Sequence, residues 1–128
     1  MTTYTALIVD DEPDIRELLE ITLTRMGITT LTAPDLTSAR KLLEQNATHL
    51  CLTDMNLPDG NGIELVQWIQ KHSPATPVAV ITAYGNMDTA IESLKAGAFD
   101  FVSKPVELPR LRELVNSALK LAEPKADA

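Results

Sequence analysis

Apolar residues gather into five short runs along the chain, each bounded by polar or turn-forming residues. They lie at 6–9, 28–31, 50–52, 78–81 and 99–102, and the run at 28–31 is the weakest. Short apolar runs between turn signals are typical of buried β-strands, although a run this short does not by itself exclude a segment of a core helix.

The segments between these runs repeat their apolar residues at helical spacing. They predict helices over 13–26, 36–45, 63–72 and 88–95, and a last helix from 108 to about 122. Pro13 suits a first helical turn, Asp35 is a predicted N-cap, and Gly27 ends the first helix. Regular alternation of strand and helix predicts an α/β protein with one doubly wound, five-stranded parallel sheet and helices on both faces.

Length and charge narrow the class of protein. The chain has 128 residues and a net charge of -7. This length suits one domain, which we place at 1–122, with 123–128 as a loose C-terminal tail or the start of a linker. The acidic balance argues against direct binding of nucleic acid by this domain.

Neither a membrane span nor a secretory signal is expected from the sequence. No apolar run approaches the roughly 20 residues of a transmembrane helix, and the N-terminus has no basic region before its apolar run. The single cysteine, Cys51, cannot form an intramolecular disulfide, which agrees with a reducing compartment. We therefore expect a cytoplasmic protein without membrane insertion.

Polar residues follow four of the five predicted strands. Asp10 and Asp11 come after the first strand, Asp54 after the third, Thr82 after the fourth and Lys104 after the fifth. In a doubly wound sheet these strand ends meet at one rim, where ligands bind. Neighbouring carboxylates repel one another when ionised and need a cation, and a few carboxylates plus water suit Mg²⁺.

This set of groups suits phosphoryl transfer. A carboxylate attacks phosphorus, a metal and an ammonium neutralise oxygen charge, and a hydroxyl hydrogen-bonds the product. Each residue alone also has an ordinary structural interpretation: Asp10 as a helix cap, Thr82 as a loop-capping residue, and Lys104 as a surface ion-pair partner. The combination, rather than any single residue, favours chemistry.

The same residues carry a family resemblance that extends over the whole chain. Asp10-Asp11-Glu12, Asp54 in LTDMNLPDGNG, Thr82-Ala83 and Lys104-Pro105 resemble the receiver domain of two-component response regulators. The stretches ALIVDDEPDIRELLE and ITAYGNMDTAIESLKAGAFDFVSKPV are similar to the subgroup that precedes NtrC-type transcription activators, among them regulators of type IV pilin genes. The resemblance implies a flavodoxin-like sheet with strand order 2-1-3-4-5.

The resemblance also implies roles for the acidic residues. Asp54 would be the phosphoacceptor and would take its phosphoryl group from a phosphohistidine on a sensor histidine kinase. Asp10 and Asp11 would hold Mg²⁺ together with Asp54, and the backbone carbonyl of Asn56 would complete the protein ligands.

Further residues would read the phosphoryl group. Thr82 would hydrogen-bond it and Lys104 would pair with Asp54 or its phosphate, with the Lys104–Pro105 peptide bond in the cis form. Phe101 stands at the position of the family's switch aromatic and has no hydroxyl, so it would act by ring burial. Tyr84 would modulate access to the phosphorus.

The implied partners lie beyond this domain. An output ATPase and a DNA-binding domain are expected in the same parent chain, a homodimer is left open, and the domain would be a signalling module that is not a turnover enzyme. Three alternatives remain: a phosphatase of the haloacid-dehalogenase type, which requires an aspartate where Asn56 stands; a receiver-like module that never accepts phosphate; and a flavin-binding module of the same topology.

Overall fold

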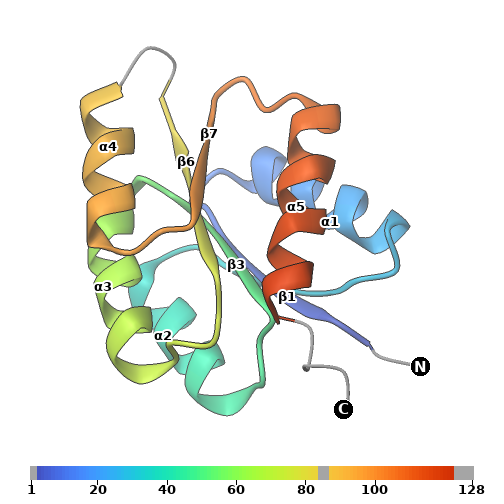
Figure 1. Ribbon diagram of the computed structural model, residues 1–128, viewed down its shortest axis with the longest axis horizontal. Coiled ribbons are helices and arrows are strands. Elements are labelled where there is room, and N and C mark those ends of the chain that lie inside the picture. The colour runs from blue at the N-terminus through green and yellow to red at the C-terminus, as the bar shows by residue number, and fades with distance from the viewer. Residues whose placement is uncertain (1–2, 84–86, 123–128) are drawn as a thin grey trace.

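A single parallel sheet forms the centre of the molecule (Figure 1). The computed structural model describes residues 3–83 and 87–122. The strands lie in the order β2-β1-β3-β6-β7, and all four pairings are parallel. Their bounds are β1 (Thr5–Val9), β2 (Thr29–Ala33), β3 (Leu50–Asp54), β6 (Val78–Thr82) and β7 (Asp100–Ser103). In order of these five strands the sheet reads 2-1-3-4-5, which confirms the predicted topology.

Helices cover both faces of this sheet. They are α1 (Pro13–Arg25), α2 (Leu36–Gln45), α3 (Gly62–His72), α4 (Met87–Ala96) and α5 (Leu108–Ala122). Figure 1 shows α1 and α5 together on one face and α2, α3 and α4 on the other. The doubly wound arrangement predicted from the alternation is therefore confirmed.

The central strands are apolar on both sides because each side packs against helices. In β1, Leu7 and Val9 belong to the cluster beneath α2 and α3, whereas Ala6 and Ile8 belong to the cluster beneath α1 and α5. All four side chains are fully buried. A strand covered on both faces reads as a continuous apolar run, which is why the sequence pattern located it.

The element boundaries differ from the prediction by one or two residues. The weakest apolar run, 28–31, corresponds to β2, which begins at Thr29 and ends at Ala33. Ile28 is buried but belongs to the preceding turn, because its N–H donates to the carbonyl of Leu23 at 3.1 Å. Three of the five residues of β2 are threonines, so a pattern based on apolar residues did not locate the end of this strand. The predicted cap is confirmed, since Asp35 accepts the N–H of Ser38 at 2.8 Å.

A small antiparallel hairpin follows β3, where the sequence indicates only a turn. It consists of β4 (Asn56–Leu57) and β5 (Gly60–Asn61), two residues each. Asn61 then caps α3: its side chain accepts the N–H of Glu64 at 3.0 Å, and the Glu64 carboxylate accepts the N–H of Asn61 at 2.9 Å. This capping box fixes the exit of the hairpin into α3.

The hairpin closes tightly against the end of β3 at Gly62. The N–H of Gly62 donates to the carbonyl of Met55 at 2.8 Å. A Cβ atom on Gly62 would lie 2.6 Å from the carbonyl oxygen of Asp54 and 3.2 Å from the Cα atom of Met55. Only glycine lets the two backbone segments approach this closely.

Replacing Gly62 with alanine should therefore destabilise the protein. The added methyl group meets backbone atoms rather than a flexible side chain, and overpacking of this kind costs about 1–3 kcal/mol. The free energy of unfolding, measured by urea denaturation, should fall by this amount. Gln67→Ala, on the exposed side of α3, is the control and should change it little. An unchanged midpoint in Gly62→Ala would show that the backbone yields at this point.

Candidate functional site at the carboxyl edge of the sheet

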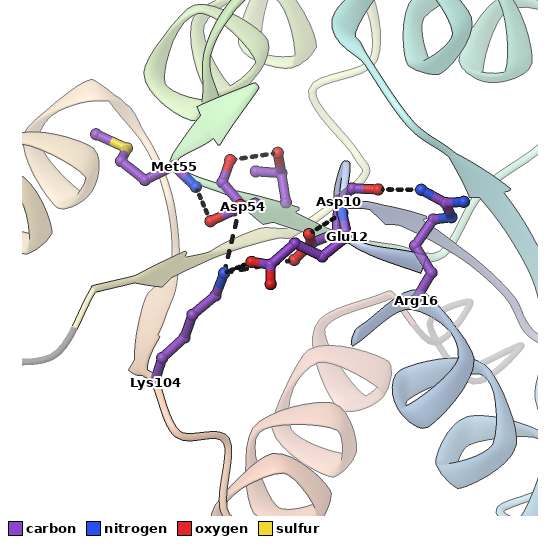
Figure 2. A network of polar contacts seen from close by, with 7 residues as sticks. Asp10, Glu12, Arg16, Asp54, Met55 and Lys104 are labelled. Carbon is purple, nitrogen blue, oxygen red and sulfur yellow. Dashed lines mark hydrogen bonds and ion pairs between the residues drawn. The ribbon is translucent and has the colours of Figure 1, made fainter. Parts of the chain in front are cut away.

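Three of the sequence-predicted residues meet at the carboxyl edge of the sheet (Figure 2). Asp10 directly follows β1, Asp54 is the last residue of β3, and Lys104 directly follows β7. Figure 2 shows the Lys104 side chain reaching from its strand towards the carboxylates of Asp54 and Glu12. The carboxyl ends of these strands thus place two carboxylates and one ammonium group in one cluster, as the sequence predicts.

Asp54 is nearly enclosed but keeps one oxygen available. Asp54 is only 5% exposed to solvent. Oδ1 accepts the N–H of Met55 at 2.8 Å, while Oδ2 lies 3.4 Å from Nζ of Lys104. The carboxylate is therefore oriented by the backbone through one oxygen, and the other oxygen lies beside a cation.

Asp10 is fully buried and only partly satisfied. Its Oδ1 accepts the N–H of Glu12 at 2.9 Å. Its Oδ2 has no hydrogen-bond partner within residues 3–83 and 87–122 and lies 3.8 Å from Nζ of Lys104. Arg16 holds the main chain here by donating to the carbonyl of Asp10 at 2.7 Å. An unsatisfied buried carboxylate oxygen is costly, so this atom indicates a site for a cation.

Glu12 is a contact that the sequence did not predict. Nζ of Lys104 lies 3.0 Å from Oε1 of Glu12, closer than to Asp10 or Asp54. The only sequence signal was the position of Glu12 directly after two aspartates. The backbone of Lys104 is itself fixed, because its N–H donates to the carbonyl of Thr82 at 2.8 Å, and the Lys104–Pro105 peptide bond is cis.

The acidic residues are close enough to share one metal ion. Ligand oxygens of Asp10, Asp11, Glu12 and Asp54 all lie within 4.8 Å of one another. Asp10 and Asp54 are buried, whereas Asp11 and Glu12 are exposed. Asn56, the predicted carbonyl ligand, lies in β4 two residues beyond Asp54. Carboxylate oxygens, among them Asp10 Oδ2 with no hydrogen bond from the described residues, fit a hard divalent cation such as Mg²⁺.

Burial shifts the pKa values of the two inner carboxyl groups upward. Burial, with a smaller contribution from the charge of Asp54, raises the pKa of Asp10 to about 6, although the hydrogen bond from the Glu12 N–H opposes the rise. Burial also raises the pKa of Asp54 against the lowering effect of the Lys104 charge. For Lys104, partial burial lowers the pKa, but the hydrogen bond to Glu12 and the charges of Asp10 and Asp54 outweigh it and raise the pKa overall.

The residues predicted to read the phosphoryl group lie on neighbouring strands. Thr82 is buried at the end of β6, one residue beyond Ile81, which pairs with Asp54 in the sheet register. Phe101 is half-buried in β7, and its carbonyl accepts a hydrogen bond from Arg110 at 2.9 Å. The prediction for Tyr84 lies outside the described residues, as does that for the tail 123–128.

The chain belongs to the family of response regulator receiver domains, because residues 6–116 match the family model described as "Response regulator receiver domain". The full-length relatives extend this result. The chain is 63% identical over 127 residues to the response regulator protein PilR of Pseudomonas aeruginosa, covering 99% of this chain and 28% of that protein. It is 36% identical to the regulatory protein AtoC of Escherichia coli, covering 94% of this chain and 26% of that protein. The chain thus spans about a quarter of the length of these relatives.

Solved structures of receiver domains superimpose closely on this one. The receiver domain of NtrX from Brucella abortus is 37% identical, with a TM-score of 0.86, and the match covers 90% of this chain and 98% of that one. The beryllofluoride-activated NtrC4 receiver domain dimer is 32% identical, with a TM-score of 0.87 and coverage of 93% and 98%. The NtrC-type resemblance seen in the sequence is thereby confirmed. No helix within 3–83 or 87–122 has the length and apolarity to span a bilayer.

Replacing Asp10 with asparagine should stabilise the protein in EDTA at pH 7.5. The pKa of Asp10 is about 6 in the folded protein against an ordinary 3.8, so the folded state binds more protons than the unfolded state between these values. This contribution to stability therefore grows as the pH falls from above 6 towards 4. Asp10→Asn removes that pH dependence and should raise the free energy of unfolding at pH 7.5 by on the order of 2 kcal/mol.

The measurement is urea denaturation of both proteins in EDTA at pH 7.5 and at pH 5. The difference in stability should shrink at the lower pH. Glu17→Gln makes the same change of charge on the exposed side of α1 and should give a small difference at both pH values. Equal stability of wild type and Asp10→Asn at pH 7.5 would contradict the destabilising burial of the ionised Asp10 carboxylate described above.

Proposed function

We propose that residues 1–122 act as a phosphorylation-activated signal receiver and that Asp54 accepts a phosphoryl group from a phosphohistidine on a sensor histidine kinase. The single observation that carries this proposal is the convergence of Asp10, Asp54 and Lys104 from three separate strands within one cluster of ionic contacts. Membership of the receiver family agrees with it.

The nucleophile in this proposal is Oδ2 of Asp54, the carboxylate oxygen that lies beside Lys104. Met55 holds Oδ1 at 2.8 Å and leaves a lone pair on Oδ2 to attack phosphorus in line. The new bond joins Oδ2 to phosphorus, and the phosphorus–nitrogen bond of the donor breaks with its electron pair going to the imidazole. The ammonium of Lys104, 3.4 Å from Oδ2 before the reaction, is close enough to pair with the phosphoryl oxygens.

The charge at this site calls for a metal ion. Mg²⁺ would be held by Asp10, Asp11, Asp54 and the backbone carbonyl of Asn56. The missing hydrogen bond at Asp10 Oδ2 and the mutual approach of the acidic groups are in keeping with this. When bound, the ion supplies positive charge that offsets the carboxylates and the transferring phosphoryl oxygens.

The phosphorylated state is stabilised by contacts that the resting state does not make. The phosphoryl group carries up to two negative charges and strong acceptor oxygens. Thr82 donates its hydroxyl to these oxygens, and the movement of Thr82 lets the ring of Phe101 turn inward. Tyr84 controls access to the phosphorus. Phosphate shifts the equilibrium only through such differential contacts.

The partners follow from this role and from the relatives. The domain passes the signal to an output ATPase and DNA-binding domain in the same parent chain and so controls transcription, with type IV pilus genes as the specific target. A homodimer stays open as the assembly in which it does so, and the beryllofluoride-activated NtrC4 receiver domain is a dimer. It acts in the cytoplasm and binds no nucleic acid directly, in keeping with its net charge of -7.

Phosphorylation should be lost when Asp54 is replaced by asparagine. An amide cannot form the acyl phosphate, so Asp54→Asn should gain no mass after treatment with acetyl phosphate and Mg²⁺, whereas the wild type should gain one phosphoryl group by intact-mass spectrometry. Asp35→Asn is the control, because asparagine is an equally good N-cap, and it should be labelled like the wild type. Labelling of Asp54→Asn would assign the acceptor to another residue.

The same preparation should show no steady-state turnover of small phosphate esters. Asn56 occupies the position at which a dehalogenase-type phosphatase has its acid, and an amide does not supply a titratable proton. The measurement is the release of inorganic phosphate from para-nitrophenyl phosphate, with the substrate supplied in many-fold molar excess over the protein. Sustained turnover that disappears in Asp54→Asn would favour the phosphatase over the receiver.

A further inference from the structure

The turn of the β4–β5 hairpin is tied to the start of α2. The carboxylate of Asp59 accepts the N–H of Leu36 at 2.8 Å, the N–H of Thr37 at 3.0 Å and the hydroxyl of Thr37 at 2.8 Å. These bonds join the segment that directly follows Asp54 to a helix more than 20 residues earlier in the chain. One side chain therefore connects the proposed phosphorylation site to α2.

The first turn of α2 depends on this carboxylate. N–H groups in the first turn of a helix have no partner within the helix. Asp35, the N-cap, accepts the N–H of Ser38 at 2.8 Å. The N–H groups of Leu36 and Thr37 bind Asp59 instead. The free N–H groups at the start of α2 are thus accepted by two aspartates, Asp35 at the helix N-cap and Asp59 in the hairpin.

The hydrogen bonds hold although Asp59 lies on the surface. The pKa of Asp59 is lowered, principally by the hydrogen bond from the Leu36 N–H and further by those from Thr37. A carboxylate at the positive end of a helix dipole is stabilised in its ionised form, and hydrogen bonds to a charged acceptor are stronger than neutral ones. Asp59 is therefore ionised and anchored at neutral pH.

The hairpin has other anchors besides Asp59, among them the capping box of Asn61 and Glu64 and the hydrogen bond from the Met55 N–H to the Ile81 carbonyl at 3.0 Å. The Gly62 N–H closes it onto the Met55 carbonyl, its own strands pair two residues with two, and Leu57 is its buried apolar side chain. Asn56 lies in the first of these strands, three residues before Asp59. Among these contacts, the bonds of Asp59 are the ones that hold the far end of the turn, three residues beyond the Asn56 main chain.

We propose that Asp59 is a positioning residue for the metal site, because its bonds to α2 fix the hairpin whose Asn56 carbonyl completes the Mg²⁺ ligands. This inference rests on the proposed function, in which Asn56 is a ligand. Asp59 does not touch the metal or the phosphoryl group; it acts through the backbone of the hairpin.

The test compares Asp59→Ala with Asp35→Ala. Both variants remove one negative charge and the hydrogen bonds of one aspartate from the same end of α2, but only Asp59→Ala releases the hairpin. Mg²⁺ affinity is measured by isothermal titration calorimetry with MgCl₂ at constant pH and ionic strength. Asp59→Ala should bind Mg²⁺ roughly 10-fold more weakly than wild type, the usual effect of losing an outer-shell contact, and Asp35→Ala less than about 2-fold more weakly.

Amide hydrogen exchange supplies a readout that is independent of the metal. In EDTA, exchange over residues 55–61 should accelerate in Asp59→Ala and stay at the wild-type rate in Asp35→Ala, while both variants speed exchange at the start of α2. Thr37→Val removes only the hydroxyl donor and keeps both backbone bonds. It should give an intermediate loss of Mg²⁺ affinity, which keeps the test usable if Asp59→Ala folds poorly.

The outcomes separate this inference from the function on which it rests. Equal Mg²⁺ affinities in Asp59→Ala and Asp35→Ala, with a wild type that binds Mg²⁺, would overturn the role of Asp59 and leave the proposed receiver function intact. A wild-type protein that binds no Mg²⁺ and takes no phosphoryl group would overturn both.

Discussion

The concentration of negative charge at one edge of the sheet is the constraint on which this structure depends. Asp10 and Asp54 are almost completely buried, and Asp11 and Glu12 stand beside them. Like charges in a poorly hydrated place raise one another's pKa, and the pKa of Asp10, about 6, reflects mainly its burial. The fold accepts this cost at the one point where the proposed function needs carboxylates, Asp10, Asp11 and Asp54 for a cation and Asp54 for a phosphoryl group.

One ammonium group divides its charge among these acids. Nζ of Lys104 lies 3.0 Å from Glu12, 3.4 Å from Asp54 and 3.8 Å from Asp10. A nucleophilic carboxylate must be ionised, yet a close ion pair would occupy its reactive oxygen. Because the shortest contact goes to exposed Glu12, Lys104 favours ionisation of Asp54 through its charge without closing on Oδ2. This geometry is compatible with the proposed role of Asp54 as a nucleophile despite its burial.

Sequence patterns predicted the parts of the molecule that apolar burial determines. The strands β3 and β6 are buried along their whole length and β1 from Ala6 to Val9, so their apolar runs were plain. The alternation with helices predicted a doubly wound parallel sheet, and the family resemblance supplied the strand order. The rim was predictable for the same reason, since parallel strands place Asp10, Asp54 and Lys104 at one edge. The hairpin was missed because two-residue strands have no periodicity. The contact of Glu12 with Lys104 joins residues 92 positions apart, and that distance depends on side-chain geometry which no spacing rule contains.

The aspartates and the asparagine of the proposed ligand set are held in place by different contacts. Asp10 and Asp54 are attached to strands whose position is fixed by the apolar clusters on both faces of the sheet. Asn56 is exposed and lies in a hairpin that combines the buried side chain of Leu57 with polar contacts, among them the bonds from α2 to Asp59. Hydrogen bonds at the surface contribute about 1 kcal/mol each to stability, far less than the core that holds the strands. In the proposed ligand set, the aspartates are therefore attached to the apolar core of the sheet, whereas Asn56 belongs to a hairpin that also relies on surface hydrogen bonds.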